Sequence, residues 1–142
     1  MVRRPGWAAL VLVAGLASGC GHAQAPSPST GSRELVRDYY EAVLRQDWGR
    51  AYTTLHAESR ARCSAEQFTR LAQSYRRDLG FEPEEVHVRS CEEHGTEAVA
   101  HVMITGRSEG KQRHYRDAVT LRQSGSQWGI VLTSGFGRSP SR

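Results

Sequence analysis

The chain has 142 residues, of which 24% are charged and 8% aromatic, with a formal net charge of +4 and an isoelectric point near 9.3. The basic and acidic residues are interspersed and form no run of like charge, which argues against nucleic acid as a partner. The length excludes an assembly of several large domains but suffices for one core, because a domain of about 100 residues buries roughly two-thirds of its surface.

The first segment, residues 1–19, has the pattern of an export signal. Arg3 and Arg4 form a positive head, and an apolar run of ten residues follows at positions 7–16. A transmembrane helix needs about 20 apolar residues, so this run is too short to span a bilayer. A charged head, a short apolar middle and small residues before a break are typical of a secretory signal.

The sequence "LASGC" at positions 16–20 resembles the lipobox of bacterial lipoproteins. The resemblance implies cleavage after Gly19 and attachment of lipid to Cys20, which would anchor the mature protein to a membrane of the cell envelope. A plain secretory signal, cleaved near Ala23 or Ala25, is the alternative.

Residues 20–31 are rich in Pro, Ser, Gly and Ala and show no periodicity, so they predict a flexible tether and no core. Removal of residues 1–19 would leave 17 basic and 15 acidic residues, a net charge of +2, which further weakens the case for nucleic acid. Residues 32–136 are expected to form one folded domain, and residues 137–142 a frayed tail.

Two cysteines, Cys63 and Cys91, remain after Cys20 is assigned to lipid. An exported protein is folded in an oxidising compartment, where an even number of cysteines favours a disulfide. A Cys63–Cys91 bridge would close a loop of about 29 residues and stabilise the fold by roughly 3.5 kcal/mol in the chain-entropy description. Two buried free thiols are the alternative.

The spacing of apolar residues predicts helices in the first half of the domain. The first begins near Ser32, and Gly49 predicts that it is bent or divided into two parts. Residues 56–63 are polar and are expected to form a loop. Residues 64–67, "SAEQ", match a capping box that opens a further helix, and Gly80 ends it.

After residue 83 the period of apolar residues changes to two. Four alternating runs are separated by the turn-like segments "EHGTE", "GRSEGK" and "QSGSQ". Helices followed by a meander of four strands predict an α+β domain, with an antiparallel sheet covered on one face by helices.

The helical segment "VRDYYEAVLRQDWGRAYTTL" and the closing hairpin "YRDAVTLRQSGSQWGIVL" resemble the nuclear-transport-factor-2-like, cystatin-like superfamily. The resemblance implies two to three N-terminal helices packed on a curved four-stranded antiparallel sheet, with a conical pocket between them. Members include polyketide cyclases, ketosteroid isomerases, dehydratases, adaptor proteins and small exported lipoproteins, so the resemblance implies no single activity.

When the chain is aligned with the superfamily on Asp47, Tyr39 falls where the isomerases carry a catalytic tyrosine, and the strand parity of Asp117 would let it point into the pocket as their second oxyanion donor does. The alternative is that Tyr39 is a core aromatic residue and that Asp117 lies at the pocket mouth or pairs with an arginine. The third group, an aspartate base soon after the first helix, has no counterpart, since that region offers only Glu58. Two donors without a base do not abstract a proton. We therefore expect a pocket that binds a ligand without catalysis, shaped by Tyr39, Tyr40, Trp48 and Asp117.

No Cys-x-x-Cys, His-Glu-x-x-His or phosphate-binding glycine loop occurs in the sequence, so we expect neither a metal nor a cofactor. The sequence predicts an exported, lipid-anchored envelope protein that is not an enzyme and that binds a small apolar ligand or an envelope protein. A pocket enzyme of the ketosteroid isomerase or polyketide cyclase type is the alternative. The ligand, the membrane and the oligomeric state stay open.

Overall fold

The computed structural model describes residues 30–138, and within them the helices precede the strands. The helices are α1 (Ser32–Leu44), α2 (Trp48–Thr53), α3 (Ala57–Arg62) and α4 (Ala65–Asp78). The strands are β1 (Glu82–His94), β2 (Glu97–Ser108), β3 (Lys111–Ser124) and β4 (Gln127–Val131). The strands form one antiparallel sheet in the order β1-β2-β3-β4, which confirms the expected α+β meander.

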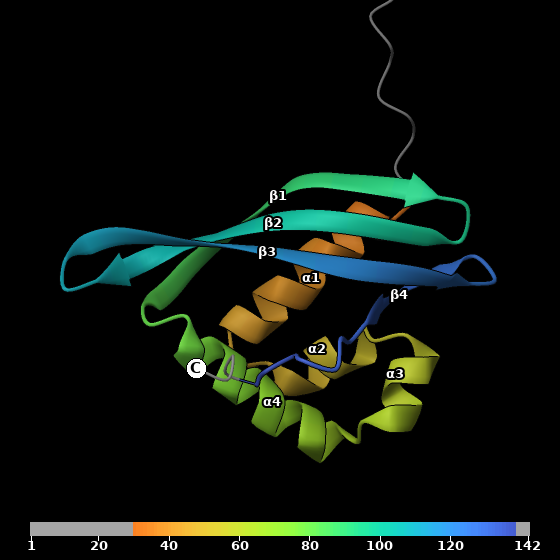
Figure 1. Cartoon of the computed structure of the whole chain (residues 1–142), viewed down its shortest axis with the longest axis horizontal. Helices are drawn as coiled ribbons and strands as arrows, with labels where there is room; N and C mark the ends of the chain where they lie inside the picture. Colours follow the sequence, from red (N-terminus) through yellow and green to blue (C-terminus); the bar gives the residue numbers. More distant parts are fainter. Residues whose placement is uncertain (1–29, 139–142) are drawn as a thin grey trace, which may run out of the picture.

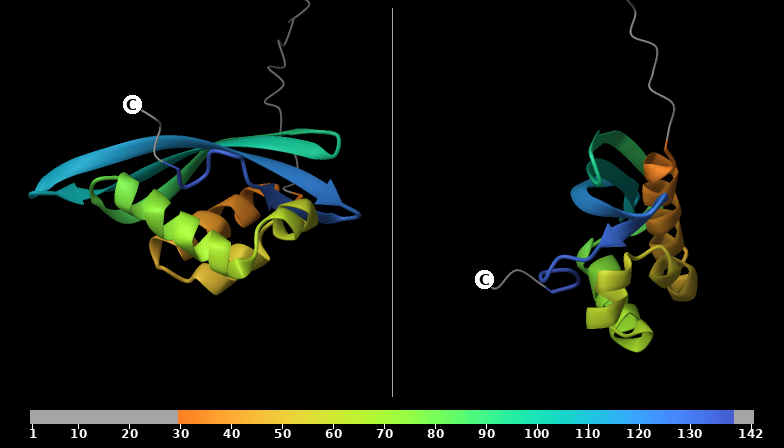
Figure 2. Two further views of the ribbon diagram at one scale, coloured as in Figure 1. Left: turned by 60° about the horizontal axis from the view of Figure 1, so that its bottom comes forward. Right: turned by 90° about the vertical axis from the view of Figure 1, so that its right-hand side faces the viewer.

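The sheet arches over the helices, which all lie on its concave side (Figures 1 and 2). α1 packs directly against the sheet, α2 and α4 pack beneath it, and α3 lies beside β4 (Figure 1). The β2–β3 hairpin extends past the helices at one end of the sheet (Figure 1). Within residues 30–138, no helix is long and apolar enough to cross a membrane.

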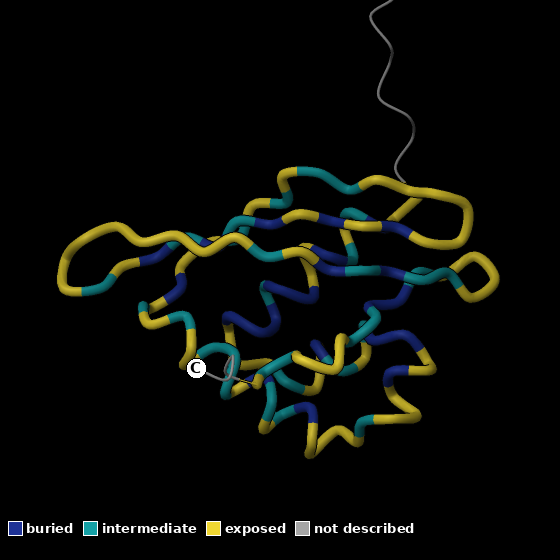
Figure 3. Tube along the Cα trace, viewed as in Figure 1, coloured by how far each residue is buried: buried dark blue, intermediate teal, exposed yellow. Residues whose placement is uncertain are grey.

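The core lies between α1 and the inner face of the sheet (Figure 3). Strand β2 shows the expected period of two, because its inward residues are at most 1% exposed while His101 between them is exposed. The inward residues of β2 are Ala98, Ala100, Val102 and Ile104. Val36 and Val43 of α1 are fully buried against this face.

The first helix is divided in two, as expected, but the break precedes Gly49. Gln46 has a φ of 61°, and the Asp47 side chain caps α2 by accepting a hydrogen bond from the backbone N–H of Arg50 at 3.1 Å. The N-cap of α1 is Gly31, and Ser32 is a buried residue of its first turn.

Residues 56–63 contain the helix α3, so the expectation of a loop is wrong. His56 caps this helix, because its Nδ1 accepts a hydrogen bond from the backbone N–H of Glu58 at 3.3 Å. The only buried residue of α3 is Ser59, so no apolar period marks the helix in the sequence. The expected capping box of α4 is confirmed, with bonds of 3.2 and 3.0 Å between Ser64 and Gln67.

Cys63 and Cys91 are free thiols, and the expected bridge between them is absent from the structure. Cys91 lies on the edge strand β1, where its Sγ is 3.3 Å from the Oγ of Ser32. Cys63 follows α3, beside β4 at the opposite edge of the sheet. Three interstrand spacings of about 4.8 Å separate the two edges, well beyond the roughly 7 Å that a disulfide allows between Cα atoms.

The segment after β4 folds back onto α4. Phe136 stacks on Tyr75 and Phe68, with ring centroids 5.3 and 5.9 Å apart. Gly137 has a φ of 65°, and a Cβ at this position would lie 2.2 Å from the carbonyl oxygen of Leu71. Residues 1–29, with Cys20, and residues 139–142 lie outside the described residues.

β4 is held to the α2–α3 connection at close range. The backbone N–H of His56 donates to the carbonyl of Ile130 at 2.8 Å, and that of Ile130 donates to the carbonyl of Thr54 at 2.9 Å. A Cβ at Gly129 would lie 2.6 Å from the Cα of His56. Only glycine therefore fits where the two backbones cross.

We expect Gly129→Ala to lower the free energy of unfolding by about 1–3 kcal/mol, because the added methyl group forces two backbones apart. Urea unfolding followed by circular dichroism measures the change. Gly49→Ala is the matched control: Gly49 lies in α2 with open space around it, so alanine should raise stability by about 0.5–1 kcal/mol. Equal effects of the two substitutions would contradict the close contact.

Candidate functional site

A cavity of about 350 Å³ lies between α1, α4, β3 and the segment after β4. Five of its lining residues are aromatic, and the cavity lies between the helices and the sheet, where the fold was expected to contain a pocket. The rings are those of Tyr39, Tyr40, Tyr75, Tyr115 and Phe136. A volume of this size suits a small ligand, since binding pockets commonly measure about 300–1,000 Å³.

Asp117 is the central polar group of this cavity. Tyr40 of α1 and Tyr75 of α4 donate hydrogen bonds from their hydroxyls to its Oδ2, at 2.9 and 2.7 Å. The backbone N–H of Ala118 donates to its Oδ1 at 2.8 Å. The expected inward orientation of Asp117 is therefore observed, and its carboxylate acts as an acceptor for three donors.

Tyr39 contributes a hydroxyl that is open to the cavity. Its side chain is 2% exposed and packs edge-on against Tyr40, with ring centroids 5.1 Å apart. The hydroxyl makes no hydrogen bond within residues 30–138, yet no buried polar side-chain atom of that part of the chain lacks a partner. The hydroxyl must therefore reach the space inside the cavity, where it can bind a ligand.

The phenols of the cavity are all held in the protonated form. Burial is the largest cause that raises the pKa values of Tyr39, Tyr40 and Tyr75, and the negative charge of Asp117 raises them further. The neighbouring phenol of Tyr75 also raises the pKa of Tyr40. At neutral pH these groups are hydrogen-bond donors.

This arrangement differs from an isomerase site in the direction of its hydrogen bonds. There a tyrosine and a protonated carboxyl both donate to the substrate. Here the protons of Tyr40 and Tyr75 are directed to Asp117, which accepts. Arg138 lines the same cavity, but none of the ion pairs among residues 30–138 includes Asp117.

Of the expected pocket residues, Tyr39, Tyr40 and Asp117 come together, and Trp48 does not. Trp48 begins α2, is half-buried against the core and does not line the cavity. Sequence reasoning missed Tyr75 as a partner of Asp117, although it sits on the apolar face of α4. The helical period marked it as a core residue, and only the packing of α4 against the sheet brings its hydroxyl to β3.

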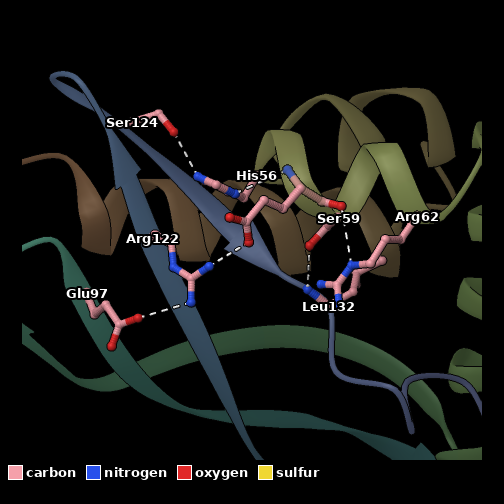
Figure 4. A network of polar contacts seen from close by, with 8 residues as sticks. His56, Ser59, Arg62, Glu97, Arg122, Ser124 and Leu132 are labelled. Carbon is pink, nitrogen blue, oxygen red and sulfur yellow. Dashed lines mark hydrogen bonds and ion pairs between the residues drawn. The ribbon is translucent and has the colours of Figure 1, made fainter.

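A second polar network joins α3 to β3 and β4 (Figure 4). Nε2 of His56 lies 2.7 Å from the Oγ of Ser124. Because Nδ1 accepts the capping bond from Glu58, Nε2 carries the proton and donates to Ser124. His56 therefore cannot take a proton from that serine, and the pair does not form a nucleophile with its base.

Glu58 belongs to the same network and lies outside the aromatic cavity. Its carboxylate pairs with Arg122, which also pairs with Glu97 of β2 at 3.1 Å (Figure 4). Within residues 30–138, no group of three or more His, Cys, Asp and Glu side chains is placed to hold a metal ion.

No family model and no curated protein matches the chain. Among solved structures, the chain is similar to a protein described as an NTF2-like transpeptidase from Campylobacter jejuni, with a TM-score of 0.55 and 9% identity over 70% of this chain and 96% of that one. It is also similar to a SEC-C motif protein from Rhodopseudomonas palustris, with a TM-score of 0.52 and 17% identity over 69% of this chain and 73% of that one. These likenesses show the expected nuclear-transport-factor-2-like fold and no particular activity.

The raised pKa values predict a loss of stability at alkaline pH. In the unfolded chain the phenols ionise near the ordinary value of 10.0, while Tyr39, Tyr40 and Tyr75 stay protonated in the folded state. Stability is therefore complete below pH 10 and falls above it, by up to about 4 kcal/mol per pH unit for three phenols.

Urea unfolding between pH 9 and pH 12 measures this slope, and Tyr75→Phe should reduce it by about a third. Absorbance at 295 nm is the second measurement, since Tyr39, Tyr40 and Tyr75 should ionise in folded protein only at a higher pH than an exposed phenol. Ionisation of all five phenols near pH 10 in folded protein would contradict the buried arrangement.

Proposed function

We propose that this protein is an exported, lipid-anchored envelope protein whose aromatic cavity binds a small ligand without changing it chemically. The observation that carries the proposal is Asp117, a carboxylate that lies among tyrosines and forms no ion pair within residues 30–138. The ligand has an apolar body that lies against the rings and a positive or hydrogen-bond-donating group that faces Asp117 and Tyr39.

The energetics favour an organic cation as the polar group. A carboxylate that is partly removed from water and lacks a cation costs free energy, which a bound cation recovers. A cation against aromatic faces gains a further 0.5–2 kcal/mol or so. Both features occur in the same cavity of about 350 Å³.

Binding without turnover is supported by the hydrogen-bond directions. Tyr40 and Tyr75 donate to Asp117, so neither presents its proton to a substrate oxygen. The other carboxyl of the lining, Asp78, is exposed at the end of α4. Proton abstraction requires a base within hydrogen-bond reach of the substrate, together with free donors for the oxyanion.

We expect the cavity to prefer a cation over a neutral molecule of the same shape. Choline and 3,3-dimethylbutan-1-ol form such a pair, and calorimetric titration of both measures the preference. The wild-type chain should bind choline about tenfold more tightly, the ratio that about 1.4 kcal/mol produces. Asp117→Asn should abolish the preference while it leaves an amide oxygen for the tyrosines.

The matched control is Asp38→Asn, since Asp38 is an exposed aspartate of α1 that pairs with Arg50 outside the cavity. This variant should keep the wild-type preference. Equal affinity of wild type for the two probes would contradict the cation site. If the wild-type protein converts an enolisable ketone, and Tyr39→Phe abolishes that conversion without unfolding the protein, the cavity is a catalytic site and the binding proposal is wrong.

The proposed site of the lipid anchor, Cys20, lies a short stretch of chain before the folded domain. Eleven residues lie between Cys20 and Ser32, the first residue of α1, and the twelve Cα-to-Cα steps of this segment reach at most about 40 Å. The folded part is tied down just before α1, where Nε1 of Trp128 donates to the Oγ1 of Thr30 at 2.9 Å. The domain would therefore be held close to the membrane surface.

Replacement of Cys20 by Ser should release the protein from the membrane fraction and abolish incorporation of a radiolabelled fatty acid. Cell fractionation and autoradiography measure the two effects. Cys63→Ser, which leaves the lipobox intact, should behave as wild type. A wild-type chain without label, or a Cys20→Ser chain that stays in the membrane fraction, would rule out the anchor.

A further inference from the structure

A second cavity, of about 430 Å³, lies between α3, α4 and the segment after β4. Phe136 forms part of its wall and part of the wall of the aromatic cavity, so the C-terminal segment separates the two. The floor of the second cavity is apolar and consists of Leu71, Leu132 and Phe136. Cys63 also lines it, half-buried.

Three arginines surround this floor, and no acidic residue lines the cavity. Arg62 uses its Nε to donate to the carbonyl oxygen of Glu58, at 3.4 Å. The side chains of Arg70 and Arg138 make no hydrogen bond or ion pair with any residue of the described range, 30–138. The nearest carboxylate on α3, that of Glu58, is held by Arg122 outside the cavity.

The uncharged polar groups of this cavity are also available as donors. The Oε1 of Gln67 accepts the capping bond from the N–H of Ser64, which leaves the amide NH₂ of Gln67. The Oγ of Ser59 accepts from the N–H of Leu132 at 3.0 Å, which leaves its O–H. A cavity that combines guanidinium groups with amide and hydroxyl donors, and has no carboxylate, is complementary to an anion.

We propose that this cavity is a second binding site, specific for an anionic group, a carboxylate or a phosphate, carried on an apolar body. The guanidinium groups of Arg62, Arg70 and Arg138 bind the anion in the bidentate manner that arginine favours. The apolar body lies on Leu71, Leu132 and Phe136. Arg138 lines both cavities, but Asp78 and Asp117 line only the first, and Arg62 and Arg70 line only the second. The two sites therefore select different ligands, and the second does not depend on the first.

The thiol of Cys63 lines this cavity, so its rate of alkylation can be used to test the site. Iodoacetate, which is negatively charged, and iodoacetamide, which is neutral, alkylate the same thiol. The rate with iodoacetate divided by the rate with iodoacetamide therefore measures the local electrostatic potential. Peptide mass spectrometry gives the ratio at Cys63 and at Cys91, which lies on β1 far from the arginines. Arg70→Gln and Arg138→Gln should each lower the ratio at Cys63 by about two- to threefold at low salt, and leave the ratio at Cys91 unchanged.

Arg113→Gln is the matched control, since Arg113 is an exposed arginine of β3 outside the cavity, and it should leave both ratios unchanged. A variant that unfolds is recognised because both thiols then react faster with both reagents. A ratio at Cys63 that the two cavity variants do not change would overturn the proposal.

Protection of Cys63 tests the ligand and its source, with Cys20→Ser protein so that no anchor contributes. Phenyl phosphate should slow iodoacetamide at Cys63 and not at Cys91, and benzyl alcohol should protect neither thiol. Protection by vesicles of phosphatidylglycerol, and not by phenyl phosphate, would assign the anion to a lipid headgroup. Absence of protection by phenyl phosphate and by the vesicles would exclude an anion site.

Discussion

The carboxylate of Asp117 joins three elements that lie far apart in the sequence. It sits on β3 and accepts hydrogen bonds from Tyr40 of α1 and Tyr75 of α4, at 2.9 and 2.7 Å. A hydrogen bond to a charged acceptor contributes about 1.5–3 kcal/mol, more than the roughly 0.5–1.5 kcal/mol of a bond between neutral groups. The same contacts that hold the helices to the sheet therefore build the wall of the cavity and place its negative charge.

The segment after β4 determines what surrounds that charge. Phe136 stacks on Tyr75 and Phe68 and lines the aromatic cavity. Together with Leu71 and Leu132 it also forms the floor of the arginine-lined cavity. Gly137 makes this path available, because a Cβ there would meet the backbone of Leu71. One short segment thus lies between the cavity that contains Asp117 and the cavity that contains Arg62 and Arg70.

The two polar networks of the domain have different roles. His56 caps α3 and contacts Ser124 of β3, and Arg122 joins Glu58 of α3 to Glu97 of β2, so each of these polar side chains has a partner within the protein (Figure 4). By contrast, the hydroxyl of Tyr39 and the side chains of Arg70 and Arg138 make no hydrogen bond within residues 30–138. Groups that the fold leaves without partners in a cavity are the ones that a ligand can engage.

The sequence by itself determined the meander and the capping box at Ser64, because these depend on local periods and spacings. The parity of β3 left two positions open for Asp117, inside the cavity or at its mouth, and the packing of α1 and α4 decided between them. The sequence also predicted the positions of Tyr39 and Tyr40. Only the tertiary structure placed Trp48 outside the cavity, held Cys63 and Cys91 at opposite edges of the sheet, and turned residues 56–63 into a helix. Each of these depends on which surfaces pack together, and no local pattern in the chain encodes that.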